Sequence, residues 1–208
     1  MVEYMERRVG ITGMESPQQL AAAMPMVERA FVFVDLCGFT AYMASNGEHA
    51  AINALTSFRN LTRDIAARRG IFIASWLGDG AMLIADSVGP AVAAAAELIA
   101  RCDQNTLKLR GGLADGWALL FDGDDYIGRP VNLAARLSQA ARPGELLAVG
   151  YPPSTFPVWI EVVGTRDLTL KGVGRLRRVQ QLGLAPGTEL PPISSWRASE
   201  RGFPDPVS

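Results

Sequence analysis

The chain has 208 residues, of which 49% are apolar, with a formal net charge of −1 and a pI near 5.9. A chain of this length and composition is expected to bury one good core rather than two. The near-neutral charge argues against the broad basic surface that nucleic-acid binding usually requires, so we expect no nucleic-acid partner.

The cysteine and histidine content and the hydropathy of the chain exclude further classes of protein. The chain has two cysteines, Cys37 and Cys102, and one histidine, His49. These are too few for a disulfide framework or a multi-histidine zinc site, which leaves hard metals bound through oxygen. The most apolar segment, around Ala91 to Ala100, is too short to span a bilayer, and the first residues do not resemble a secretory signal. We therefore expect a soluble, cytoplasmic protein with no membrane partner.

The first predicted elements lead from a mixed segment into a strand and a helix. Residues 1–29 combine charged side chains with glycine and proline, and we expect them to form a lead-in segment. A strand is predicted from Ala30 to Val34, where it runs into Asp35 and a glycine turn that opens a helix. Apolar residues at helical spacing predict a helix from Glu48 to Arg69, which Gly70 ends.

A hairpin is predicted after this helix. Two β-type runs, Ile71 to Leu77 and Ala81 to Ala85, are joined through Gly78-Asp79-Gly80. Asp-Gly between such runs is a turn signal. Asp79 is therefore expected at the tip of the hairpin.

The later elements alternate less regularly. Helices are predicted from Val88 to Cys102 and from Val131 to Ala140, and β-type runs at Leu107–Leu113, Trp117–Phe121, Glu145–Val149, Trp159–Val163, Leu168–Leu170 and Arg175–Leu182. Strands and helices alternate first and strands cluster later, which predicts an α+β sheet with helices covering one face. We expect residues 30–184 to form the domain and the proline-containing residues 185–208 to be irregular or disordered.

Two carboxylates are the first candidates for chemistry. Asp35 ends a buried strand and Asp79 caps a turn, so their side chains converge if the two strands are neighbours. Converging carboxylates repel each other unless a cation lies between them, and Mg²⁺ accepts one or two carboxylates together with substrate phosphates. The alternative is that one acid caps a helix and the other belongs to a hairpin, unrelated in space.

A second group of candidates lies later in the chain. Asn132 and Arg136 are four residues apart and share one face of the predicted helix, where an amide and a guanidinium could orient a sugar and bind a phosphoryl group. The alternative is a solvated helix face. Lys171 is a candidate phosphate ligand, or a surface lysine at a turn.

In order along the chain, these segments resemble the class III nucleotidyl cyclase catalytic domain, the family of adenylate and guanylate cyclases. The resemblance covers roughly Ala30 to Leu182 and rests on strings at five places. They are Val34-Asp35-Leu36-Cys37-Gly38-Phe39-Thr40, Gly78-Asp79-Gly80-Ala81-Met82, Asp125-Tyr126-Ile127-Gly128-Arg129-Pro130-Val131-Asn132-Leu133-Ala134-Ala135-Arg136-Leu137, Pro143-Gly144-Glu145-Leu146-Leu147 and Leu170-Lys171-Gly172.

The resemblance implies a ferredoxin-like βαββαβ core extended by C-terminal strands, and a head-to-tail homodimer with shared active sites. It implies that Asp35 and Asp79, with the Leu36 carbonyl, bind two Mg²⁺ or Mn²⁺ ions in each site. It also implies that one segment of backbone amides cradles the phosphates of ATP, and its residues are Cys37, Gly38, Phe39 and Thr40.

By the same resemblance, the partner chain supplies the groups that bind the nucleoside and the transition state. Asn132 orients the ribose, Arg136 stabilises the α-phosphoryl group and Lys171 meets the triphosphate. Asp125 and Ser75 fall at the two base-reading positions. The implied reaction converts ATP to 3′,5′-cyclic AMP and pyrophosphate.

Ser75 departs from the family pattern. Adenylate cyclases commonly have a lysine at this position, four residues before the second metal-binding aspartate. Asp125 can accept a hydrogen bond from the adenine amine, whereas the guanine carbonyl would face it unfavourably, so adenine is favoured. Three hypotheses stand: an adenylate cyclase, a cyclase-like nucleotide-binding or regulatory module with little turnover, and, as the weakest, a guanylate cyclase.

Overall fold

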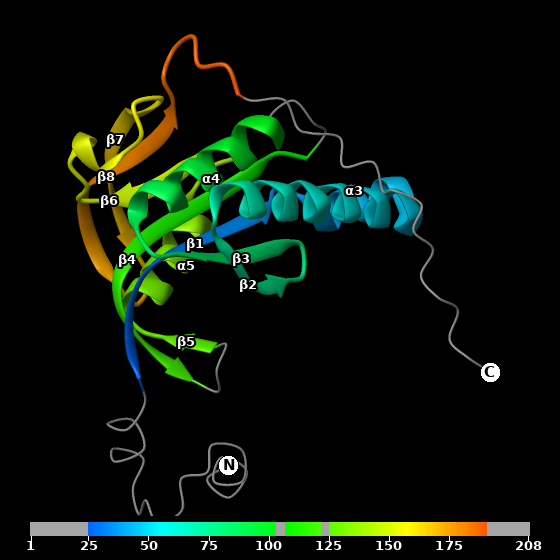
Figure 1. Cartoon of the computed structure of the whole chain (residues 1–208). Helices are drawn as coiled ribbons and strands as arrows, with labels where there is room; N and C mark the ends of the chain where they lie inside the picture. The colour runs from blue at the N-terminus through cyan, green and yellow to red at the C-terminus, as the bar shows by residue number, and fades with distance from the viewer. Residues whose placement is uncertain (1–24, 103–106, 122–124, 191–208) are drawn as a thin grey trace, which may run out of the picture.

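The computed structural model describes residues 25–102, 107–121 and 125–190, most of which belong to one eight-stranded sheet and its helices (Figure 1). In chain order the elements are β1 (Met26–Leu36), α3 (Phe39–Arg69), β2 (Phe72–Leu77), β3 (Gly80–Ala85), α4 (Val88–Cys102), β4 (Leu109–Phe121), β5 (Asp125–Ile127), α5 (Arg129–Ala140), β6 (Leu146–Val149), a short 3-10 helix (Pro153–Thr155), β7 (Ile160–Leu170) and β8 (Gly174–Leu184).

The first elements, β1 to β4 with α3 and α4, form the predicted βαββαβ core. Their strands lie in the order β2-β3-β1-β4, and each neighbouring pair is antiparallel. This is the arrangement of a ferredoxin-like fold. β6 joins β4 in parallel, and β8 and β7 continue the sheet beyond it. The predicted fold class, with its extension by C-terminal strands, is confirmed.

Alternate residues of β1 face two different cores. Ala30, Val32 and Val34 are buried with residues of α3 and α4, whereas Phe31 packs with Ala134 of α5. Successive side chains of a strand point to opposite faces of a sheet, so α5 covers the face opposite to α3 and α4. The prediction that the helices cover one face is therefore wrong for α5.

The position of α5 depends on Gly112. A Cβ atom at Gly112 would overlap the backbone of Ala134 and Ser138 in α5, whereas one at Gly111 would lie 3.3 Å from Ile99 of α4. Two consecutive glycines of β4 thus let helices approach the strand from both faces. The apolar pattern of the α5 segment carries no information on which face it takes.

Several strands are longer than the sequence predicted, among them β7, which joins the runs predicted at Trp159–Val163 and Leu168–Leu170. β1 begins at Met26 rather than Ala30, because its first residues pair with β4 as far as Leu119. The two runs predicted on either side of Gly116 form a single strand, β4, which continues through this glycine at a φ of 138°. The long β1–β4 pair carries the end of the sheet well beyond the core.

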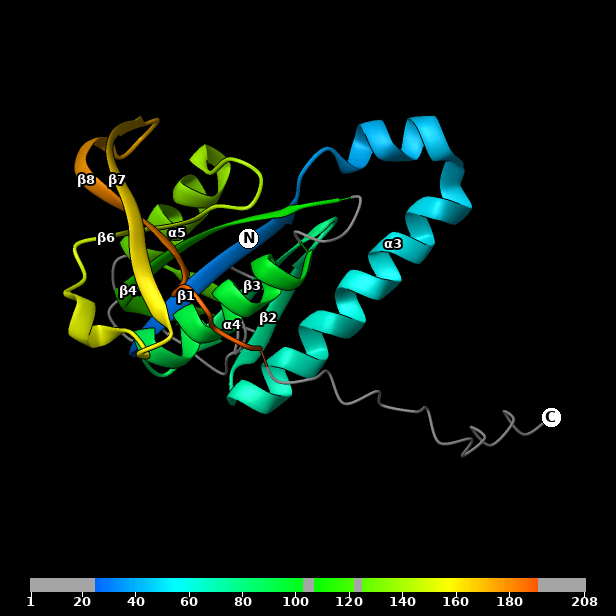
Figure 2. The same ribbon diagram turned by 90° about the horizontal axis from the view of Figure 1, so that it is seen from above.

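α3 is the longest helix among the described residues. It begins at Phe39, after Gly38 in the left-handed conformation, and is interrupted at Gly47, whose φ of 82° is not helical. Viewed from above, α3 runs beside the sheet and projects past it (Figure 2). No helix in the described part of the chain, α3 included, is both long enough and apolar enough to cross a bilayer.

A fully buried carboxylate ties α4 to the end of α3. Glu97 is 0% exposed and accepts hydrogen bonds of 2.7 to 3.0 Å from Arg68, Arg69 and Arg101. Burial acts to raise the pKa of Glu97, but the three guanidinium donors hold this pKa below its usual value. Both carboxylate oxygens are occupied, so the group is satisfied within the fold.

Candidate active site

Asp35 and Asp79 lie next to each other at one end of the sheet, because β1 and β3 are neighbouring strands. Asp35 is the last residue but one of β1 and pairs with Gly80, the first residue of β3. The N–H of Leu36 donates to the carbonyl of Asp79 at 3.2 Å, which ties the β2–β3 turn to the end of β1. Gly78 allows the turn with a φ of 65°.

The two carboxylates interact electrostatically. Burial raises the pKa of Asp79 above its usual value, and the negative charge of Asp35 raises it further, while a backbone hydrogen bond and Arg110 act in the opposite direction. Acids this close repel each other when both are ionised, unless a positive charge compensates them. The pair therefore favours a bound cation.

Arg110 is a residue of this site that the sequence did not reveal. It lies on β4 directly opposite Asp35, and its Nε and Nη2 atoms donate to Asp35 Oδ2 at 3.0 and 2.6 Å. In the sequence, Arg110 is one basic residue in a predicted strand. Only the register of β1 against β4 brings it to the carboxylate, and the sequence does not give that register.

The donor atoms at the end of β1 suit a hard divalent cation. They are the carboxylate oxygens of Asp35 and Asp79, with the carbonyl of Leu36 beside them. Among the described residues there is no group of three or more His, Cys, Asp or Glu side chains that could hold a metal ion. Two carboxylates with positions left for phosphate and water are what Mg²⁺ commonly accepts, so the residues fit Mg²⁺ or Mn²⁺.

The turn after β1 presents backbone amides beside the carboxylates. The N–H of Cys37 donates to the carbonyl of Lys108 at 2.8 Å, so this amide is already used within the fold. Gly38, Phe39 and Thr40 follow at the first turn of α3, where N–H groups have no acceptor within the helix. An anion would therefore be bound by residues 38–40 rather than by the Cys37 amide.

Asn132 and Arg136 lie on the outer face of α5. The opposite face carries Ala134 and Leu137, both 0% exposed against the sheet. The Arg136 guanidinium donates through Nη1 to the side chain of Gln139 at 2.9 Å. The two candidate residues share a helix face, as their spacing predicted, and this face is directed away from the molecule.

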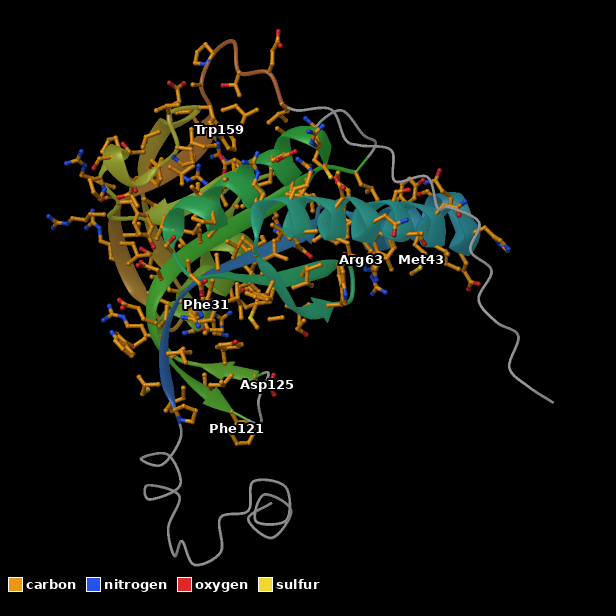
Figure 3. The ribbon with its side chains drawn as sticks, viewed as in Figure 1. Phe31, Met43, Arg63, Phe121, Asp125 and Trp159 are labelled. Atoms are coloured by element: carbon orange, nitrogen blue, oxygen red, sulfur yellow. The ribbon has the colours of Figure 1, made fainter. Side chains whose placement is uncertain are left out.

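Asp125 lies far from the carboxylate pair. It pairs with Phe121 at one end of β4, on a hairpin that projects from the sheet (Figure 3), whereas Arg110 faces Asp35 at the other end. A strand rises about 3.3 Å per residue, so these ends of β4 are separated by roughly 35 Å along the strand. Lys171 is exposed in the turn between β7 and β8. One copy of the chain does not bring Asp125 to Asp35 and Asp79.

A β-bulge in β2 determines where Ser75 points. Ile73 pairs with Leu83, but Ser75 pairs with Met82, so the register shifts at Ala74. Directly paired residues share a face of the sheet, and Met82 belongs to the core beneath α5. Ser75 is therefore on the α5 face, the face that also carries Asp35.

The chain is similar in sequence to curated proteins of Mycobacterium tuberculosis. An uncharacterized protein is 37% identical over 144 residues, which is 67% of this chain and 37% of that protein. A pH-sensitive adenylate cyclase is 31% identical over 159 residues, which is 72% of this chain and 40% of that protein. The chain thus spans less than half the length of these relatives. No protein-family model matches it.

Solved structures share the fold over most of the chain. The guanylyl cyclase Cya2 has a TM-score of 0.68 and 18% identity, with 80% of this chain and 98% of that chain covered. The adenylyl cyclase CyaB from P. aeruginosa has a TM-score of 0.65 and 24% identity, with 78% of this chain and 96% of that chain covered. At these identities the likeness is one of fold.

Proposed function

The chain has the fold of the class III nucleotidyl cyclase catalytic domain, and from this premise we propose that it is an adenylate cyclase that converts ATP to 3′,5′-cyclic AMP and pyrophosphate. The observation that supports this most is the pair formed by Asp35 and Asp79 beside the first turn of α3. It combines two oxygen ligands for divalent cations with amides for phosphates, the two requirements of a metal-bound nucleoside triphosphate.

The active site is shared between two copies of the chain. Asp125 lies at the opposite end of β4 from the carboxylates, and Asn132 and Arg136 face outward from α5, so a second copy has to supply these groups. An exposed apolar surface is available for contact with the second copy. Met26 and Ile127 pair with β4 from either side, and with Trp117 they are 49%, 55% and 57% exposed. Exposed apolar residues grouped on one face are typical of protein interfaces.

The proposed mechanism assigns one role to each residue. Asp35 and Asp79, with the Leu36 carbonyl, would hold two Mg²⁺ or Mn²⁺ ions, and residues 38–40 would bind the β- and γ-phosphates. When bound, the ions lower the pKa of the ribose 3′-hydroxyl and neutralise the leaving pyrophosphate. The chain positions ATP so that this oxygen attacks the α-phosphorus in line as the bond to pyrophosphate breaks.

The second copy contributes the groups that act on the nucleoside and the transition state. Asn132 orients the ribose, Arg136 stabilises the negative charge that builds up on the α-phosphoryl group, and Lys171 binds the triphosphate. Asp125 accepts a hydrogen bond from the adenine amine, and Ser75 reaches the ring through a water molecule. A relative named as an adenylate cyclase supports the choice of adenine.

A product assay tests this proposal. The purified chain is incubated with ATP or GTP, each with Mg²⁺ or Mn²⁺, and the products are separated by chromatography. We expect cyclic AMP and pyrophosphate in equal amounts from ATP, and no product from the Asp79→Ala variant. Robust activity in that variant would refute the metal assignment. Preferred conversion of GTP would make the chain a guanylate cyclase.

A second candidate function is a nucleotide-binding regulatory module with little turnover. Ser75 favours it, because a short hydroxyl stands where a longer cationic side chain would contact the base. Calorimetry with ATP distinguishes the two functions: tight binding without product under any metal condition would favour the module. Under the cyclase proposal, Ser75→Lys is expected to increase turnover of ATP relative to GTP.

A further inference from the structure

The guanidinium of Arg110 holds only one half of the Asp35 carboxylate. Both Nε and Nη2 donate to Oδ2, at 3.0 and 2.6 Å, and neither contacts Oδ1. The third nitrogen, Nη1, donates to the carbonyl of Gln139 in α5 at 3.4 Å. Arg110 is thus fixed between the carboxylate and the end of α5.

The second oxygen of Asp35 points to the opposite side, toward β3. A Cβ atom built on Gly80 would lie 3.4 Å from Oδ1. Gly80 directly follows Asp79, and the N–H of Leu36 holds the Asp79 carbonyl at 3.2 Å. Oδ1 therefore faces the start of β3, next to the turn that carries Asp79, while Oδ2 faces Arg110.

We propose that Arg110 is a positioning residue for the metal site: by binding Oδ2 it fixes the Asp35 carboxylate so that Oδ1 faces Asp79 and can bind a divalent cation. This inference rests on the proposed function. The inference goes beyond the proposed function because it assigns a role to Arg110, a residue that is not itself a metal ligand.

Two physical effects give Arg110 this influence. A carboxylate held by two N–H groups does not rotate freely, so its ligand oxygen is already in place when the ion arrives. The positive charge also reduces the repulsion between Asp35 and Asp79 before the ion binds. Both side chains of the pair are about one-third exposed, at 31% and 30%, so solvent screens the interaction only in part.

The chain offers a closely matched control in Arg69. Its Nε and Nη2 atoms also donate to a single carboxylate oxygen, Glu97 Oε2, at 3.0 and 2.7 Å, and its side chain is 22% exposed. Arg69 belongs to the α3–α4 contact on the other face of the sheet. Arg69→Ala therefore removes the same type of interaction, with its cost in stability, away from the proposed metal site.

The experiment titrates the full chain with Mn²⁺ alone and measures free Mn²⁺ by electron paramagnetic resonance. We expect Arg110→Ala to weaken Mn²⁺ binding by about 10- to 100-fold, the usual effect of losing a residue that orients a metal ligand. Arg69→Ala is expected to bind Mn²⁺ like the wild type. Arg110→Lys keeps the positive charge but loses the paired hydrogen bonds to Oδ2, so its affinity for Mn²⁺ should lie between those of Arg110→Ala and Arg69→Ala. It replaces the alanine variant if that variant does not fold.

Each alternative result has a definite meaning. If Arg110→Ala binds Mn²⁺ as tightly as Arg69→Ala, Arg110 does not position the carboxylate. If it binds Mn²⁺ more tightly than the wild type, Arg110 blocks the site and the inference is wrong in sign. If the wild type binds no Mn²⁺, or binds it equally well after Asp79→Ala, the metal assignment itself fails, and the inference with it.

Discussion

Two of the carboxylates that arginine holds, Glu97 and Asp35, differ in how many of their oxygens are occupied. Glu97 has both oxygens occupied by three guanidinium groups and is 0% exposed. Asp35 has one oxygen held by Arg110, has a second acid beside it, and is 30% exposed. Glu97 is fully paired in the folded chain, whereas Asp35 has its second oxygen, Oδ1, on the side of Gly80, the residue after Asp79.

This difference separates a structural ion pair from a candidate site. A buried carboxylate without partners costs several kcal/mol, so full pairing is what a stable fold requires of Glu97. Two neighbouring acids that share one arginine carry excess negative charge, which a fold would keep only at some cost. Incomplete charge compensation, rather than the presence of an ion pair, marks the end of β1 as the candidate site.

The largest expected effect on activity comes from neutralising Asp35, the carboxylate with one oxygen not held by arginine. Asp35→Asn should lower cyclic AMP formation by about 10² to 10³ and change the thermal unfolding temperature little, because it removes a proposed metal ligand rather than a buried partner. Glu97→Gln should leave the activity of the folded fraction close to that of the wild type. Initial rates per folded chain check both expectations. Equal losses of activity in Asp35→Asn and Glu97→Gln would contradict the distinction between a candidate site and a structural ion pair.

Stability is expected to change in the reverse order. Glu97→Gln leaves three guanidinium groups around one neutral acceptor, and breaking a buried ion pair by changing one partner costs about 3 kcal/mol or more. Asp35→Asn should cost clearly less, since its partner Arg110 is in contact with solvent. Urea unfolding of both variants measures the difference in the free energy of unfolding. A larger loss for Asp35→Asn would contradict the account.

A smaller effect is expected from pH. Glu97 has a lower pKa in the folded chain than its usual value of 4.5, so its contribution to stability is present above that value and is lost as the pH falls through the folded pKa. The wild type should therefore lose stability below pH 4.5 more steeply than Glu97→Gln. Thermal unfolding at a series of pH values from 7 to 3 tests this, and parallel curves would argue against a stabilising carboxylate.

The smallest effect is expected at another carboxylate–arginine pair, which lies on the surface. Arg175 donates to Asp167 at 3.1 Å, and these side chains are 66% and 46% exposed. Solvent-exposed pairs contribute little to stability, so Arg175→Ala should leave the urea midpoint within the error of measurement. A clear loss would mean that exposure does not rank these three pairs.

Much of the fold could be predicted because it depends on local signals. The apolar strand before Asp35, the Asp-Gly hairpin and the alanine-rich helix that begins at Val88 each follow from neighbouring residues. The face taken by α5 could not be predicted, because it depends on the absence of a Cβ atom at Gly112 where two distant segments touch. The continuation of β4 through Gly116 likewise depends on its partner, β1.

Some residues of the candidate site could likewise be predicted from the sequence, and others could not. Asp35 and Asp79 could be proposed from their places at a strand end and a hairpin turn. Arg110 could not, because its contact with Asp35 depends on strand register, and the bulge at Ala74 that turns Ser75 to the α5 face leaves no mark in the sequence. The use of the Cys37 amide by Lys108 is also a long-range contact.

Mixing two inactive variants tests the central claim most directly, namely that the carboxylate pair of one copy acts with α5 of another. Asp35→Ala and Arg136→Ala chains should each be inactive, but their heterodimer contains one site with both groups intact. Equal amounts that mix at random should regain about one quarter of the wild-type rate of cyclic AMP formation, since half of the dimers carry one of two sites. No recovery in heterodimers isolated by two different affinity tags would contradict the account.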